Sequence, residues 1–195
     1  MSYITLAEVK AHAQIMDNAR DADLLRLIEA ASRFLDRAIG VPDGAFRVTV
    51  ASSRTFFLPQ PARHLVSDVP MLQLQGAFYR SAPSGPEQDF TGRVVLVVSM
   101  FGTDGPGRVF VRTDGVEFSP GWWRLLGLWG VSQVPPADIA HAAVILALSW
   151  LRKGPTHYAV ESISALEGRV VAGDDIPQEV QSTIQRWQAQ LGLVP

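Results

Sequence analysis

The chain has 195 residues, of which 47% are hydrophobic and 18% are charged. This composition is typical of one globular unit with a full core, and it is too apolar for a disordered chain. The 17 basic and 19 acidic side chains give a formal charge of −2, so no strong positive field is available to bind nucleic acid through its phosphates. The sequence contains no cysteine, which excludes disulfides and thiolate catalysis and is compatible with assembly in a reducing cytoplasm. No apolar stretch is long enough to span a bilayer, so we expect no membrane role.

Two helices are predicted at the start of the chain. Thr5 followed by Glu8 is a capping-box pattern, which predicts a short first helix. Between residues 24 and 38, apolar residues recur every three or four positions and charged residues lie outside this stripe, which predicts a longer amphipathic helix. Gly40 is expected to end this helix, because glycine readily adopts the left-handed conformation of a helix terminus.

From residue 46 to residue 130 the pattern changes to β-branched and aromatic runs separated by turn residues, which predicts antiparallel strands. The expected strands are 46–58, 62–66, 71–79, 86–90, 93–101, 108–113, 116–118 and 122–130. The glycine-rich segment 102–107 is interpreted as a hairpin turn, because it lacks the Gly-Lys-Ser/Thr ending of a phosphate loop. Alternation along the last strand places Trp123 and Trp129 on one face, in a β core or a subunit interface.

The helical pattern returns after Pro135-Pro136, which predicts a helix through about residue 152. This helix is apolar nearly all round, so we expect it to be buried centrally or between subunits. Residues 156–175 are interpreted as an extended arm or hairpin. A last helix opens at Pro177 and carries an apolar stripe at spacings of four, three and four residues: Val180, Ile184, Trp187 and Leu191.

These elements together predict an α+β fold in a single domain over residues 1–195. Its helical core consists of two N-terminal helices within 1–45 and, within 134–195, a long central apolar helix, the arm and a C-terminal helix. A large antiparallel β insertion occupies residues 46–130.

The residues that could carry chemistry do not form a recognisable catalytic or metal site. The four histidines, His12, His64, His141 and His157, lie far apart and have no carboxylate at a spacing typical of metal ligands. The carboxylate pairs Glu87/Asp89 and Asp174/Asp175 lie beside turns, where acidic side chains are usually solvated. We therefore predict a non-enzymatic protein with no catalytic residue, cofactor or metal. A carbohydrate-binding or hydrolytic β-rich domain, with Trp122 and Trp123 exposed beside carboxylates, is the alternative from another class.

Three blocks of sequence, taken in order, resemble the head–tail connector (adaptor) proteins of long-tailed double-stranded DNA phages. Residues 4–12 (ITLAEVKAH) and 21–31 (DADLLRLIEAA) look like the family's short helix, acidic turn and long helix. Residues 129–139 (WGVSQVPPADI) are similar to its strand-to-helix junction, and residues 176–181 (IPQEVQ) to the start of its terminal helix.

The resemblance implies a structural virion protein at the head–tail junction, assembled in the host cytoplasm. It implies a ring of about twelve copies that docks on the portal protein, extends the DNA channel and provides the attachment site for the stopper or tail. Packaged DNA would pass through the lumen without specific binding. A stopper or tail-completion protein of the same particle is the alternative within this class.

Two sets of residues are expected to act in such a ring. Acidic residues of the arm are predicted to line the channel, where symmetry repeats each charge around the lumen: Glu161, Glu167, Asp174 and Asp175. The stripe formed by Val180, Ile184, Trp187 and Leu191 is predicted to contact the portal or an adjacent subunit. That the stripe belongs instead to the intramolecular core is an equal alternative.

Overall fold

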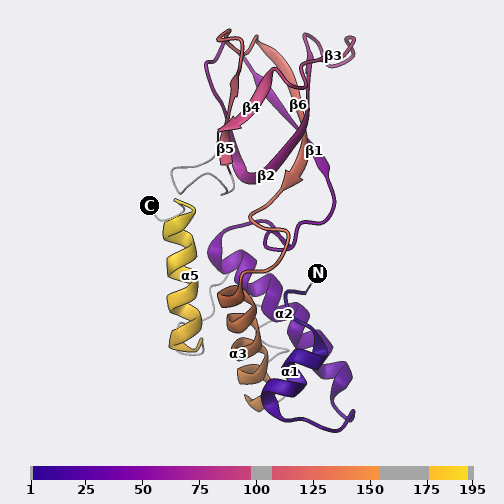
Figure 1. The fold of residues 1–195 in the computed structure, drawn as a ribbon, viewed down its shortest axis with the longest axis vertical. Helices are drawn as coiled ribbons and strands as arrows, with labels where there is room; N and C mark the ends of the chain where they lie inside the picture. Colours follow the sequence, from indigo (N-terminus) through magenta and orange to yellow (C-terminus); the bar gives the residue numbers. More distant parts are fainter. Residues whose placement is uncertain (1, 98–106, 154–175, 193–195) are drawn as a thin grey trace. The chain divides into compact units, whose positions relative to one another are not determined.

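The computed structural model describes residues 2–97, 107–153 and 176–192, and these contain four helices and six strands (Figure 1). The helices are α1 (Leu6–Ala13), α2 (Asp21–Ile39), α3 (Ala137–Lys153) and α5 (Gln178–Gln190). The strands are β1 (Ser52–Leu58), β2 (Leu65–Arg80), β3 (Gln88–Asp89), β4 (Val94–Val97), β5 (Gly107–Arg112) and β6 (Gly121–Trp129). The α+β class expected from the sequence is therefore confirmed.

The chain divides into two compact units. The helical unit comprises residues 1–44 and 135–195, and the β unit comprises residues 45–134. None of the described helices is both long enough and apolar enough to cross a membrane.

The ends of α1 and α2 follow the signals expected from the sequence. The Thr5 hydroxyl accepts a hydrogen bond from the Glu8 backbone N–H at 3.2 Å, and the Thr5 N–H donates to the Glu8 carboxylate at 2.6 Å, which completes a capping box. Gly40 ends α2 in the left-handed conformation with φ of 88°, and its N–H donates to the carbonyls of Asp36 and Arg37.

Small residues lie where the helices of the helical unit pack together. Helix α2 contacts α3, and α5 contacts both of them. Ala31 of α2 and Ala143 of α3 are fully buried, as is Ala147 one turn further along α3. Because alanine has only a methyl side chain, helix backbones can approach closely at such positions. Gln188 of α5 also donates a hydrogen bond to the Ala38 carbonyl of α2 at 2.7 Å.

The β unit contains an antiparallel sheet in the order β1-β6-β2-β5-β4, with β3 paired to the end of β2. The sequence predicted separate strands at 62–66 and 71–79, but β2 runs without interruption from Leu65 to Arg80. Shifts of register between Val66 and Met71, and between Leu74 and Gly76, let this one long strand pair with β5 at its start and with β6 along the rest. Bulges of this kind have no clear sequence signature.

Other predicted strands are shorter than expected. The first begins at Ser52 rather than residue 46, and the predicted strand at 86–90 is reduced to β3. Residues 116–118 form no strand, because only Phe118 pairs there, through a bridge to Ala62. The predicted strand 93–101 is present as β4, and its residues 98–101 lie outside the described residues.

Aromatic side chains fill the core of the β unit. Trp123 is fully buried, with ring contacts to Phe118 at 4.8 Å and Phe90 at 5.2 Å between centroids. Trp129 belongs to the same core cluster, as the strand alternation predicted. Both indole N–H groups are satisfied by backbone carbonyls, that of Trp123 by Ser119 at 3.0 Å and that of Trp129 by Ser52 at 2.9 Å.

Candidate functional site

The predicted docking stripe on α5 is partly buried within the helical unit itself. Val180 is fully buried and Ile184 is 8% exposed, so packing inside the chain accounts for both. The indole N–H of Trp187, which is partly buried, donates to the Asp138 carboxylate of α3 at 2.9 Å. Leu191, just beyond α5, is also partly buried. That Trp187 and Leu191 contact another molecule stays a prediction.

Polar side chains also join α3 and α5 at the surface. Arg186 bonds the Asp138 carboxylate at 2.7 Å, and the His141 ring contacts the Glu179 carboxylate at 3.1 Å. His12 of α1 approaches His141 edge-on, with 5.9 Å between ring centroids. This grouping was not predicted from the sequence, because the fold joins residues that are between 38 and 129 positions apart. Within the described parts of the chain, no three histidine or acidic side chains are arranged to hold a metal ion.

The helical unit also contains a buried carboxyl group. The side chain of Asp36, near the C-terminal end of α2, accepts hydrogen bonds from the Tyr3 hydroxyl and from the Gly44 N–H, the latter at 2.8 Å. Burial raises the pKa of Asp36 to about 6, although these two hydrogen bonds oppose the change. The same contacts fix the first residues of the chain on α2, since the Tyr3 N–H also donates to the Ser32 hydroxyl at 3.0 Å.

The predicted channel-lining residues, Glu161, Glu167, Asp174 and Asp175, lie outside the described residues. Their expected position in a channel therefore stays a prediction.

The face of the sheet opposite the aromatic core carries a group of charged and aromatic side chains, which we call the arginine face. Strand pairing places Thr55 opposite Arg124 and Arg124 opposite Phe78, and in the next row Phe57 opposite Trp122 and Trp122 opposite Arg80. Because successive residues of a strand point to opposite faces, these side chains lie opposite the core residues Trp123 and Leu125. The face consists of these two rows and Glu87, which precedes β3: Thr55, Phe57, Phe78, Arg80, Glu87, Trp122 and Arg124.

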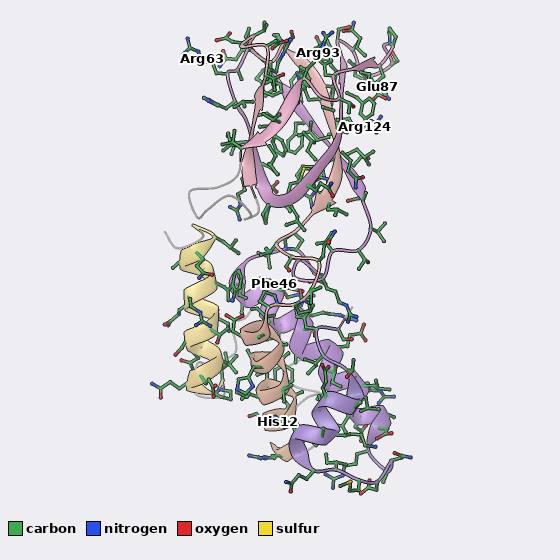
Figure 2. All side chains as sticks on the ribbon, in the orientation of Figure 1. His12, Phe46, Arg63, Glu87, Arg93 and Arg124 are labelled. Carbon is green, nitrogen blue, oxygen red and sulfur yellow. The ribbon has the colours of Figure 1, made fainter. Side chains whose placement is uncertain are left out.

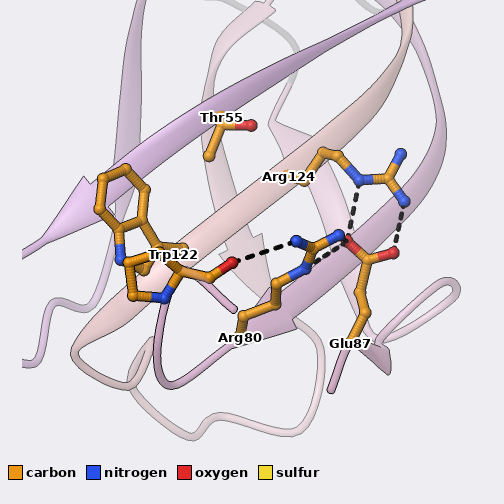
Figure 3. A pocket seen from close by; sticks show the side chains of 6 residues that line it. Thr55, Arg80, Glu87, Trp122 and Arg124 are labelled. Atoms are coloured by element: carbon orange, nitrogen blue, oxygen red, sulfur yellow. Dashed lines mark hydrogen bonds and ion pairs between the residues drawn. The ribbon is translucent and has the colours of Figure 1, made fainter. Parts of the chain in front are cut away.

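An ion-pair network organises this face. Arg124 donates to both carboxylate oxygens of Glu87, at 2.9 and 2.6 Å, and Arg80 donates to Oε1 from Nε at 3.2 Å. Figure 3 shows both guanidinium groups pointing toward this carboxylate. The hydrogen bond from Arg124 lowers the pKa of Glu87, and the same contact raises the pKa of Arg124. Both groups are therefore charged at neutral pH.

Aromatic rings support the arginines. The Arg124 guanidinium lies over the Phe78 ring, 4.2 Å from its centroid, and the Phe57 and Trp122 rings are 4.9 Å apart. Beside them is a hollow of about 150 Å³. Its lining combines an apolar wall, the charged network and one hydroxyl: Trp122, Pro83, Arg80, Glu87, Arg124 and Thr55. Sites for small molecules usually measure about 300–1,000 Å³, so this hollow is suited to one side chain.

The sequence did not predict this network. Glu87 was expected to be merely solvated beside a turn, because its partners Arg80 and Arg124 belong to two different strands. The alternative of a sugar-binding platform needed the Trp122/Trp123 region exposed beside carboxylates. Trp122 is partly exposed beside Glu87, but Trp123 is fully buried in the core and cannot contribute to such a platform.

A protein-family model matches the first part of the sequence. The family is described as "Phage gp6-like head-tail connector protein", and its model matches residues 3–70. This segment contains α1, α2 and β1 and the first residues of β2. No curated protein matches the chain.

Chains of solved structures share the fold over nearly the whole length. One belongs to "Neck of empty GTA particle computed with C6 symmetry", with a TM-score of 0.62, 17% identity, and coverage of 95% of this chain and 89% of that chain. A chain of "Virion of native gene transfer agent (GTA) particle" matches with a TM-score of 0.58, 18% identity, and coverage of 95% and 89%. A chain of "Neck of native GTA particle computed with C12 symmetry" matches with a TM-score of 0.58 and 16% identity, and the match covers 95% of this chain and 88% of that chain. The resemblance to head–tail connector proteins, inferred from three blocks of sequence, is thus confirmed for the first block by the family match over residues 3–70. The blocks at residues 129–139 and 176–181 lie outside that match.

Proposed function

We propose that the protein is a non-enzymatic head–tail connector (adaptor) in the neck of a phage-like particle. Copies of the chain form a ring that docks on the portal protein and extends the DNA channel. The far side of the ring provides the attachment site for the stopper or tail. The ring assembles in the host cytoplasm, and packaged DNA passes through its lumen without specific binding.

The agreement of two comparisons carries this proposal. The family match covers residues 3–70, and the fold of the neck chains extends over 95% of the chain, including the larger part of the β unit, which lies beyond the family match. One matched neck was computed with C12 symmetry, which supports a ring of about twelve copies here. Another was computed with C6 symmetry, which divides such a ring evenly.

Charge and packing are consistent with a structural role. The formal charge of −2 disfavours tight binding of DNA, which a channel must avoid. An acidic lining made by Glu161, Glu167, Asp174 and Asp175 is part of the proposal. So is contact of the α5 stripe with the portal or a neighbouring subunit, through Trp187 and Leu191, since Val180 and Ile184 are already buried.

Electron microscopy of the purified protein mixed with its portal protein tests the main proposal. We expect rings at one end of the portal, with the symmetry and position read from the same images. A protein that stays monomeric beside the portal would refute the proposal. A ring found only beyond another neck protein would instead indicate a stopper or tail-completion protein.

Replacing Trp187 tests the docking role of α5. Trp187→Ala is expected to reduce portal binding at least about tenfold in co-sedimentation, because buried tryptophans often dominate interface energies. The chain should remain folded by circular dichroism. Trp187→Phe is the matched control, since it keeps a ring but loses the hydrogen bond to Asp138. If Trp187→Ala unfolds the chain, the stripe is part of the intramolecular core.

A further inference from the structure

The arginine face has the composition and exposure of a protein-binding surface. Phe57 is 57% exposed, and the side chains of Arg80 and Arg124 are 39% and 30% exposed. Strand β1, which forms one border of the face, contacts only β6 among the described helices and strands. Tryptophan and arginine are enriched at the energetic centres of interfaces, and here they adjoin one another.

The network predicts the charge of the group that binds there. Two guanidinium groups share the single Glu87 carboxylate, so the cluster keeps one positive charge. Each guanidinium carries five N–H donors, and only some of them are used by Glu87 and the Pro83 carbonyl. The Glu87 contacts hold both arginines in place before binding, which lowers the entropic cost of ordering them. The hollow therefore fits an anionic tip on an apolar stem, as in an aspartate or glutamate side chain.

The distribution of charge in the sequence indicates where this acidic side chain comes from. Residues 45–134 contain eight basic and six acidic side chains, whereas the rest of the chain contains nine basic and thirteen acidic ones. The β unit thus carries a net positive charge. The acidic excess outside it equals the four arm residues assigned to the channel, but the helical unit also presents exposed acidic side chains such as Asp17 and Asp23. In a cyclic ring each contact joins two different surfaces of neighbouring copies, so unlike charges on the two units can meet at every interface.

We propose that the arginine face binds an acidic side chain from the helical unit of a second copy of this chain. The inference rests on the proposed ring. It assigns Arg80, Arg124 and Trp122 to the contact between copies, and it makes the β unit a part of the ring interface.

Photo-crosslinking from the hollow tests the proposal directly. Because the chain contains no cysteine, Thr55→Cys can carry a single benzophenone label in the full-length protein. Isotopically light labelled and heavy unlabelled chains are mixed and assembled on the portal, and crosslinked peptides are identified by mass spectrometry. Arg63→Cys, at a side chain 82% exposed elsewhere on the β unit, is the control (Figure 2).

We expect crosslinks from Thr55→Cys to residues 1–44 or 135–195 of a heavy chain, and none of these from Arg63→Cys. Crosslinks to the portal, to another particle protein, or to the β unit of a second copy overturn the inference. Rings that form without any such crosslink overturn it while leaving the proposed function intact. Absence of rings in the electron micrographs counts against the proposed function as well.

Two substitutions with opposite expected effects separate docking from a purely structural role of the network. Arg124→Gln should weaken association of copies about tenfold, because it removes a charged donor from the contact. Glu87→Gln removes the negative charge that competes with the incoming carboxylate, while its amide oxygen can still accept a hydrogen bond that holds an arginine in place. It should therefore strengthen association, measured by analytical ultracentrifugation or by the protein concentration needed for ring formation. If both substitutions weaken association equally, the network only maintains the sheet and the proposal is wrong. Arg63→Gln is the matched control and should change nothing.

Discussion

Both units have aliphatic side chains in their cores, but buried alanines recur on the helices of the helical unit, whereas buried aromatic rings recur in the β unit. Ala31 and Ala143 are fully buried in the helical unit, and Trp123, Phe110 and Phe118 are fully buried in the β unit. The buried alanines leave room for helix backbones to approach closely, while the sheet buries large rings whose indole N–H groups reach backbone carbonyls. The two units should therefore respond in opposite ways to changes in side-chain size.

The largest expected effect is the loss of a core ring from the β unit. Trp123→Ala should lower the free energy of unfolding by about 3–5 kcal/mol, because it removes buried surface and leaves a cavity. Trp122→Ala, one position away on the partly exposed face, should cost much less. Urea denaturation followed by circular dichroism measures both. Equal losses for the two variants would contradict the core described for the β unit.

The helical unit was the more predictable of the two, because its boundaries are set by local chemistry. Thr5 with Glu8, and Gly40, mark helix ends through contacts within a few residues. The β unit depends on pairing between distant segments. Nothing near residues 62–79 indicates that bulges will join two predicted strands into β2, and nothing near Glu87 points to Arg80 or Arg124. The contact of His12 with His141 was missed for the same reason.

The second expected effect is a change of stability with pH, and it arises from Asp36 in the helical unit. Among the residues the structure describes, Asp36 is the only buried residue with an acidic or basic side chain. Its pKa in the folded chain is about 6, against an ordinary value of 3.8, so the folded state retains the proton between these values. The contribution of Asp36 to stability is therefore fully present below about pH 4, falls as the pH rises toward 6, and is constant above about pH 7.

The total change from Asp36 is on the order of 2–3 kcal/mol, at about 1.4 kcal/mol per pKa unit. Asp36→Asn should remove this pH dependence while keeping the shape of the side chain. Urea denaturation of both proteins between pH 4 and pH 8 gives the difference. Parallel pH profiles for the two proteins would show that Asp36 does not hold its proton in the folded state.

The smallest expected effect comes from enlarging a buried side chain in a helix, the opposite of removing a ring from the sheet. Ala31→Leu places extra methylene groups at a fully buried position of α2, and overpacking of this kind typically costs about 1–3 kcal/mol. Ala30→Leu, the exposed neighbour on the same helix, should change stability by less than about 0.5 kcal/mol, because leucine and alanine have similar helix propensities. The difference between the two leucine variants thus isolates packing from helix propensity. If Ala31→Leu is tolerated as well as Ala30→Leu, the close approach of helix backbones is not what stabilises this unit, and the contrast with the aromatic β core no longer holds.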